Sequence, residues 1–279
     1  MAINRAEIRN LFVFKGEFEV DFCPGINVII GSNGTGKTTL LRAMYYYPAR
    51  KLIDCISINY FDDDWDGDCI FIPEKDMLSH SKGLPETVRH GNAQFSQIEV
   101  DIIERARVLP SAPEQPLYWK ICDIISGEPE HDGQSFYMNR NDVDKPIPFS
   151  MEASGYRKFG LLALLIRNEQ IKPGSVLFWD EPENSLNPEL IPKLVDILLE
   201  LSRNGVQIFI ATHSEILSSY FAVNREKSDS VMFYSLYKDG EVVKSSSNDR
   251  FDLLHPNNLT AEPVKLYEKE IEKGLGSND

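Results

Sequence analysis

Eight consecutive residues, placed between two apolar segments, have the composition of a phosphate-binding loop. Glycines let a backbone wrap closely around phosphate oxygens, because they lack a Cβ and accept positive φ. Lys37 supplies a charge to the outer phosphates, and the hydroxyl of Thr38 is an oxygen ligand of the kind that Mg²⁺ prefers. The pattern G-x-x-x-x-G-K-[ST], followed by Thr39, therefore predicts a site for ATP and Mg²⁺. Its residues are Gly31, Ser32, Asn33, Gly34, Thr35, Gly36, Lys37 and Thr38.

Two acidic residues follow a second apolar segment far downstream. Residues 176–179 are all apolar, which is typical of a fully buried parallel strand, and Asp180 and Glu181 come directly after them. In an α/β sheet, ligands sit at the carboxyl ends of the strands. We therefore expect Asp180 to hold the Mg²⁺ shell and Glu181 to orient and deprotonate an attacking water. The alternative is a strand that ends in an ordinary surface turn.

A third apolar segment is expected to bring a histidine to the same edge of the sheet. Residues 189–203 have the spacing of an amphipathic helix, and residues 206–211 read as a buried strand that leads into His213. A lone histidine is more often a structural residue than a ligand contact. Its position after a strand end, downstream of the two acids, favours a contact with the γ-phosphate.

A fourth element is the start of an apolar helix predicted over residues 159–167. Ser154 has the character of an N-cap, and Gly155 permits close backbone approach. A helix N-terminus near Arg157 and Lys158 is an anion-binding feature. The alternative is an ordinary capped helix of the core.

These four elements, in this order and spacing, resemble the ABC-type ATPase heads, and the RecF, SMC and overcoming-lysogeny-defect branch in particular. Residues 8–12, 18–22 and 25–31, and the run at 180–188, are similar to that branch. The resemblance implies an α/β, P-loop NTPase fold with a mostly parallel central sheet flanked by helices. It also implies a homodimer in which two subunits pack head to tail and hold two ATP molecules between them. Ser154 and Gly155 would then contact the γ-phosphate on the other subunit, Asn187 would lie at the dimer interface, and His213 would be the switch histidine.

Two features depart from the family pattern. Tyr156 stands where the family has the second glycine of its Ser-Gly-Gly signature. No clear Q-loop glutamine is evident, since Gln94 and Gln97 are candidates while residues 70–75 lie nearer the expected strand end. The interval that carries long coiled-coil arms in SMC-like relatives shows no sustained heptad pattern here.

The remaining segments predict one ATPase head over residues 1–279. Its core would be residues 1–48 and 150–279, and an inserted antiparallel β lobe would occupy residues 49–149. Within that lobe, residues 96–103 suggest a strand, and residues 56–61 and 69–72 suggest two strands flanking an acidic hairpin tip at 62–67. The acidic run at 62–67 begins like a calcium-binding loop, but Pro73 stands where such a loop needs its last acidic ligand. Near the end, residues 231–236 and 241–243 read as a strand pair. Residues 261–273 read as a terminal helix packed on the core, and the alternative is a helix that docks to a partner.

Composition narrows the classes of function. The net charge of −14 argues against a large nucleic-acid surface on this chain, so any broad nucleic-acid contact is expected through a partner. The four cysteines show no metal or redox spacing, and no apolar segment approaches the length of a membrane span. Nothing resembles a signal peptide. We therefore expect a cytoplasmic protein without direct membrane contact.

The leading hypothesis from the sequence is an ATPase that dimerises on ATP, opens on hydrolysis and switches a separately encoded effector. That effector would be a nuclease or toxin in DNA maintenance or anti-phage defence. The ATPase subunit of a membrane transporter is the alternative, and the run at 183–188 weighs against it. A structural nucleotide-binding module with little turnover is the third hypothesis; it fits Tyr156 but leaves Glu181 without a purpose.

Overall fold

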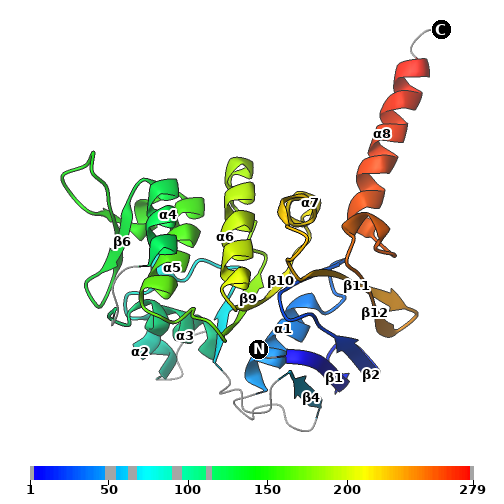
Figure 1. Cartoon of the computed structure of the whole chain (residues 1–279), viewed down its shortest axis with the longest axis horizontal. Helices are drawn as coiled ribbons and strands as arrows, with labels where there is room; N and C mark the ends of the chain where they lie inside the picture. Colours follow the sequence, from blue (N-terminus) through cyan, green and yellow to red (C-terminus); the bar gives the residue numbers. More distant parts are fainter. Residues whose placement is uncertain (1–2, 48–54, 62–67, 90–95, 111–114, 277–279) are drawn as a thin grey trace.

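A six-stranded, mostly parallel sheet runs through the middle of the fold (Figure 1). The computed structural model describes residues 3–47, 55–61, 68–89, 96–110 and 115–276. Five strands of the sheet are parallel, and only the edge strand β12 is antiparallel. This confirms the predicted fold class. In spatial order the strands are β12 (Val242–Asn248), β11 (Val231–Asp239), β3 (Ile26–Gly31), β10 (Gln207–Ala211), β9 (Val176–Asp180) and β5 (Cys69–Ile72).

Both faces of this sheet are buried, which explains why its central strands are continuously apolar. In β9, Leu177 and Trp179 belong to the core on one face, whereas Phe178 belongs to the core on the other. Successive side chains of a strand point to opposite faces, so a strand covered on both sides needs apolar residues at every position.

Helices cover one face of the sheet, and one helix with a small second sheet covers the other (Figure 1). On the first side lie α4 (Pro116–Ile125), α5 (Ser154–Arg167), α6 (Ile191–Arg203) and α7 (Glu215–Asn224). On the second side, α1 (Lys37–Tyr46) is sandwiched between the central sheet and an antiparallel sheet of order β2–β1–β4. Those three strands are β1 (Ile3–Leu11), β2 (Phe14–Asp21) and β4 (Ile56–Tyr60).

Strands β4 and β5 do not form the hairpin that the sequence predicted for residues 56–61 and 69–72. Strand β4 pairs with β1, while β5 pairs with β9 in the central sheet, so the expected partners lie in different sheets. The hairpin prediction was wrong because turn residues between two apolar runs do not by themselves specify which strand each run pairs with. The acidic run at 62–67 lies outside the described residues.

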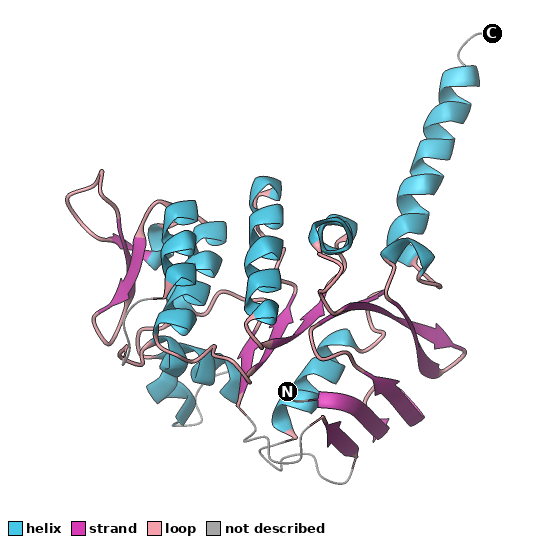
Figure 2. Cartoon of the chain, in the orientation of Figure 1, coloured by secondary structure: helices cyan, strands magenta, loops and turns pink. Residues whose placement is uncertain are grey.

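The interval 49–149 contributes to the core as well as to a lobe. Its strand β5 extends the central sheet, and its helix α3 (Gln97–Ala106) packs against β5 and α5. Residues 84–89 form helix α2 (Leu84–Arg89). An antiparallel sheet of β6 (Glu128–His131), β7 (Phe136–Asn139) and β8 (Ile147–Pro148) completes the interval (Figure 2).

Residues 96–103, predicted as a strand, are instead the N-cap and the first two turns of helix α3. The alternation of apolar and polar residues resembles a strand over the first half of the segment. Ser96 and Glu99, however, form a capping box that satisfies free N–H groups at a helix start. Ile102 and Ile103 are both buried, which the wide apolar face of a helix allows.

The C-terminal region follows the prediction in its elements but not in its packing. Strands β11 and β12 form the expected antiparallel pair. Helix α8 (Asn258–Gly276) projects away from the rest of the chain, and its side chains Val264, Leu266 and Tyr267 are more than half exposed (Figures 1 and 2). The expectation of a packed terminal helix was therefore wrong. None of the helices among the described residues combines the length and the apolar character that crossing a membrane requires.

One buried side chain joins the two sheets that enclose α1. Gln207, fully buried on β10, accepts a hydrogen bond from the backbone N–H of Ile3 at 2.8 Å. Its amide nitrogen donates to the carbonyl oxygens of Ile3, at 2.7 Å, and Cys23, at 2.8 Å. Three backbone groups at the start of the fold are therefore satisfied by a single residue.

We predict that Gln207→Ala lowers the free energy of unfolding by about 2–4 kcal/mol, because it leaves buried N–H and C=O groups without partners. Urea denaturation followed by circular dichroism measures this change. Gln97→Ala on the exposed face of α3 is the matched control and should change stability by less than about 0.5 kcal/mol. Equal effects of the two substitutions would contradict the bridging role.

Candidate functional site

The loop between β3 and α1 has the backbone that its glycines permit. Gly31, Gly34 and Gly36 all have positive φ, at 154°, 77° and 98°. A Cβ on Gly36 would lie 2.7 Å from the Cγ2 of Val13 and 2.8 Å from the Cζ of Phe14, so only glycine fits. The loop therefore closes tightly and presents the N-terminus of α1, which favours anions.

The lysine of this loop is folded back against the loop itself. Lys37 is buried, and its Nζ donates to the carbonyl oxygen of Gly31 at 2.7 Å. Burial is the main cause that lowers the pKa of Lys37, while the nearby carboxylates of Glu181 and Asp180 raise it. The ammonium thus lies among loop and strand-end groups, where phosphate oxygens would be strong acceptors.

A hydroxyl and a carboxylate meet at the start of α1. The Oγ1 of Thr38 donates to the Oδ1 of Asp180 at 3.1 Å, which places two oxygen ligands side by side. Burial raises the pKa of Asp180 to about 6, against a smaller opposing effect of the Thr38 hydrogen bond. A buried carboxylate beside a hydroxyl fits a hard divalent cation, whose charge would favour the ionised form. Within the described ranges, no cluster of three or more His, Cys, Asp or Glu side chains forms a separate metal site.

The next residue along the chain has a strained backbone and contacts the histidine. Glu181 has φ 47°, a left-handed value uncommon outside glycine. Its Oε1 lies 3.1 Å from the Nδ1 of His213. The histidine is about half exposed, so its Nε2 remains free to face a ligand. The strand ends of β9 and β10 therefore bring Glu181 and His213 together, although they are 32 positions apart in the sequence.

Glu183 is a site residue that the sequence reasoning missed. Its side chain is 9% exposed, and its Oε1 accepts hydrogen bonds from the Oγ1 of Thr212, at 2.5 Å, and from the backbone N–H of His213, at 3.4 Å. Its Oε2 is buried without a hydrogen-bond partner. Glu183 therefore holds the loop that carries the histidine. The signal was available, because an acid two residues after Asp-Glu is unexpected in a turn that needs only one carboxylate.

The Ser154 and Gly155 segment lies at the start of α5, but not as the sequence predicted. The helix begins at Ser154 rather than at residue 159, and Ala153 occupies the N-cap position without a side-chain hydrogen bond. The Oγ of Ser154 instead donates to the carbonyl oxygen of Ser185 at 2.7 Å. The prediction of a serine cap was wrong because that hydroxyl bonds to the loop after β9, which leaves the first N–H groups of the helix without a cap.

Asn187 also lies in the loop after β9. Its side chain accepts a hydrogen bond from the N–H of Glu189 at 3.2 Å, so it caps the short 3₁₀ turn Pro188–Leu190 that precedes α6. Within the part of the chain that the structure describes, no hydrogen bond joins Asn187, Ser154 or Gly155 to residues 31–38. These three residues therefore form a group of their own rather than part of the phosphate loop of the same chain.

The loop that follows β5 fills the place where a Q-loop residue was sought. Strand β5 ends at Ile72 beside β9, and Glu74 accepts a hydrogen bond from the Nδ2 of Asn184 at 2.5 Å. Gln97 lies instead on α3 and bonds to Asp101, and Gln94 is outside the described residues. An acid rather than a glutamine therefore follows this strand end.

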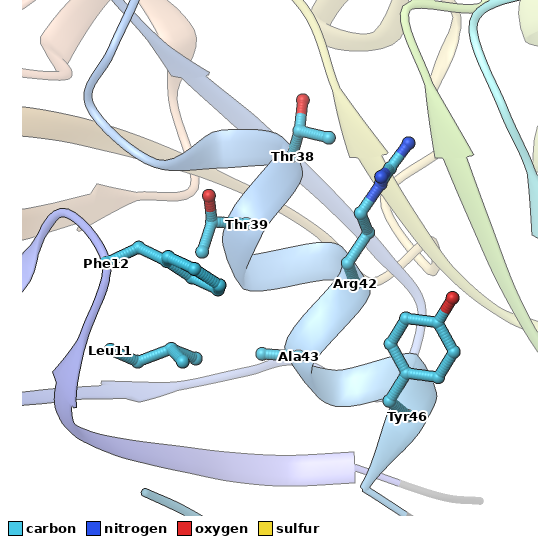
Figure 3. Close-up of a pocket in the computed structure, with 7 residues that line it drawn as sticks. All are labelled: Leu11, Phe12, Thr38, Thr39, Arg42, Ala43 and Tyr46. Carbon is cyan, nitrogen blue, oxygen red and sulfur yellow. The ribbon is translucent and has the colours of Figure 1, made fainter. Parts of the chain in front are cut away.

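A cavity of about 540 Å³ opens beside the phosphate loop (Figure 3). It lies between α1 on one side and, on the other, Leu11 at the end of β1 and Phe12 in the turn that follows. Phe12 has φ 52° and is 80% exposed, and Figure 3 shows its ring facing the helix close to Thr39. An exposed aromatic ring next to a phosphate site suits a flat base. Sequence reasoning missed it because no motif marks a turn residue whose exposure is known only from the fold.

Two family models match this chain. The model described as "AAA domain, putative AbiEii toxin, Type IV TA system" matches residues 70–219, which is more than half of the chain. A second model, described as "AAA domain", matches residues 5–47. The two matches together include the phosphate loop, the strand-end acids and the histidine.

Curated relatives that match over most of the chain are ATP-binding proteins. The glutamate/aspartate import ATP-binding protein GltL of Escherichia coli is 30% identical over 80% of this chain and 80% of its own length. The arginine transport ATP-binding protein ArtP of Haemophilus influenzae is 21% identical over 88% of this chain and 93% of its own length.

Solved structures share the fold at low sequence identity. An SMC head bound to the C-winged-helix domain of ScpA aligns with a TM-score of 0.59 and 11% identity, over 89% of this chain and 98% of that one. A nucleotide-free ATP-binding cassette of an ABC transporter aligns with a TM-score of 0.51 and 14% identity, over 89% and 91% of the two chains. These likenesses show that the chain has the fold of both kinds of ATPase.

We predict that Phe12→Ala weakens ATP binding at least about fivefold, since loss of base stacking on an aromatic ring costs about 1–3 kcal/mol. Calorimetric titration of ATP measures the change, and inorganic tripolyphosphate, which has no base, should bind both proteins equally. Phe61→Ala removes an exposed ring outside the cavity and serves as the control, while Lys37→Ala should weaken both ligands. An equal loss for ATP and tripolyphosphate in Phe12→Ala would rule out a base contact.

Proposed function

This chain belongs to the AAA-domain family and is an ATPase of the ABC and SMC type, and from that premise we propose that it acts as an ATP-driven dimer that switches a separate effector protein. Two subunits would bind head to tail around two ATP molecules, and hydrolysis would let them part. ATP shared across the interface gives the closed state its differential stability, which is what a nucleotide switch requires.

The presence of two features that favour anions, the phosphate loop and the start of α5, supports this proposal. The phosphate loop, Asp180, Glu181 and His213 gather at one edge of the sheet. The uncapped start of α5, with Ser154 and Gly155, forms a second feature that bonds to the loop after β9. In a head-to-tail dimer, the start of α5 on one subunit would reach the γ-phosphate held by the other. A two-fold interface of this kind uses the same surface on both subunits.

Within one subunit we assign the chemical roles as follows. Lys37 and the N-terminus of α1 would bind the β- and γ-phosphates, and Thr38 and Asp180 would hold Mg²⁺, which neutralises phosphate charge when bound. Glu181 would orient the attacking water and accept its proton. The Nδ1 of His213 faces the carboxylate of Glu181, so its Nε2 would be the atom that contacts the γ-phosphate.

The effector is the part of the proposal that rests on analogy. The family description names a toxin, and a similarly folded SMC head binds the C-winged-helix domain of ScpA, so a soluble partner is consistent with both comparisons. The exposed apolar side chains of α8 offer one surface for such a partner. With a net charge of −14, the chain itself is unsuited to broad nucleic-acid contact, which the effector would supply.

A transporter role is the second candidate, because GltL and ArtP are named as import and transport ATP-binding proteins. The two roles differ in the partner. Tagged Glu181→Gln, purified from its native cells with Mg-ATP and analysed by mass spectrometry, should retain a soluble nuclease or toxin. Recovery of a polytopic membrane protein instead would overturn the effector proposal in favour of the transporter.

For the dimer itself, we predict that Glu181→Gln binds ATP and becomes dimeric, because loss of the base stalls hydrolysis in the closed state. Adding Ser154→Arg should keep ATP binding but leave the protein monomeric, since a long cation replaces the hydroxyl at the start of α5. Multi-angle light scattering with and without Mg-ATP measures the mass.

Ser202→Arg, at the far end of α6, is the matched control and should still dimerise in the Glu181→Gln background. A dimer that persists in the Ser154→Arg variant would refute the composite site. A Glu181→Gln protein that stays monomeric with ATP would refute the ATP-driven dimer as a whole.

A further inference from the structure

Three residues at the start of α5 contact the segment after β9. The Oγ of Ser154 donates to the carbonyl oxygen of Ser185 at 2.7 Å. Gly155 lies so close to that loop that a Cβ would be 3.0 Å from the Cδ1 of Leu186 and 3.1 Å from the Cδ1 of Leu190. One turn further along, the Nζ of Lys158 donates to the carbonyl oxygens of Glu181, at 3.2 Å, and Pro182, at 3.1 Å. The two segments are therefore packed as one unit.

Lys158 is thereby hydrogen-bonded to the backbone of Glu181, which has a strained conformation and is the proposed base. Glu181 keeps its left-handed φ of 47°, and such conformations persist only where surrounding contacts hold them. The N–H of Glu181 donates to the carbonyl oxygen of Ala211 at 2.8 Å, and its carbonyl oxygen accepts from Lys158 and from the N–H of Asn184, at 3.1 Å. Of these contacts, only the one from Lys158 comes from α5.

The charges around the ammonium explain why a lysine occupies this position. Four carboxylates act on it, those of Glu183, Glu74, Asp76 and Glu181, with Glu183 the strongest. Burial nevertheless lowers the pKa of Lys158 to about 8. Glu183 is the same carboxylate that holds the Thr212–His213 loop. Lys158 thus links the start of α5 to Glu181 directly and to His213 through the carboxylate of Glu183. These are the two side chains that would act on the γ-phosphate of the same subunit.

We propose that Lys158 is a positioning residue that couples the two ATP sites of the dimer. The position that α5 takes against the partner's γ-phosphate would, through Lys158, set the position of Glu181 in its own subunit. The inference rests on the proposed ATP-driven dimer. A shift of the α5 start by the partner's nucleotide moves the ammonium, and with it the peptide that fixes the direction of the Glu181 carboxylate. Hydrolysis at one site then depends on occupancy of the other.

We expect Lys158→Met to lower kcat for ATP hydrolysis at least about tenfold, because misplacement of a reacting group by about 1 Å costs up to about a hundredfold in rate. The KM for ATP should change less than about threefold, since Lys158 does not touch the phosphate loop, and the Hill coefficient for ATP should fall toward 1. Lys158→Arg should recover much of kcat, because a guanidinium also donates to two carbonyl oxygens. Steady-state hydrolysis over a range of ATP concentrations measures all three quantities.

Lys120→Met removes a surface ion pair with Glu200 and is the matched control, expected to behave like the parent. Thermal unfolding and ATP-dependent mass in the Glu181→Gln background show whether Lys158→Met still folds and dimerises. A parent-like kcat and Hill coefficient, or a loss of kcat that Arg does not recover, would overturn the coupling role while leaving the dimer proposal intact. A parent protein that neither dimerises nor hydrolyses ATP would instead refute the proposed function itself.

Discussion

Strands β3, β10 and β9 pair in parallel, with Ala211 opposite both Ile29 and Asp180. This register is the constraint on which the site depends. It places the ends of all three strands at one edge, so the phosphate loop, the two acids and the histidine loop begin within a few ångströms of each other. A one-residue slip of β9 would turn Asp180 toward the opposite face of the sheet. The buried apolar faces on both sides prevent that slip, so the core specifies the site as well as the stability of the fold.

The residues next to the reacting groups use hydrogen bonds rather than packing for their precision. Glu181 is held through its backbone, and His213 through the buried carboxylate of Glu183. Burying a carboxylate with one unpartnered oxygen costs free energy, and a neighbouring ammonium offsets part of that cost. The segment after β9 therefore holds both a strained backbone, at Glu181, and a carboxylate with one unpartnered oxygen, at Glu183. Strained backbone of this kind is often found at ligand sites and in segments that change state with a ligand.

Much of the nucleotide site could be predicted from the sequence, because its signals are local. A glycine loop between a strand and a helix, and acids directly after apolar runs, specify their own surroundings. The failures arose where a distant partner decides the outcome. The hydroxyl of Ser154 bonds to Ser185 instead of capping its own helix, and β4 and β5 join different sheets. The wrong prediction of a strand at residues 96–103 had another cause. The capping box of Ser96 and Glu99 was visible in the sequence, but the short alternation of apolar and polar residues was given more weight. Phe12 owes its importance to its exposure, which one sequence does not reveal.

Helix α8 has its base beside the phosphate loop, where the Nδ2 of Asn258 donates to the Oγ of Ser32 at 2.9 Å. Its 19 residues extend about 28 Å from that point, at a rise of 1.5 Å per residue. A straight helix that turned about this contact with the phosphate loop would act as a lever. A rotation of about 10° at the base displaces the free end by about 5 Å, a distance comparable to one turn of helix. A movement too small to disturb the core would therefore be large enough, at the tip, to separate one side chain from its neighbour.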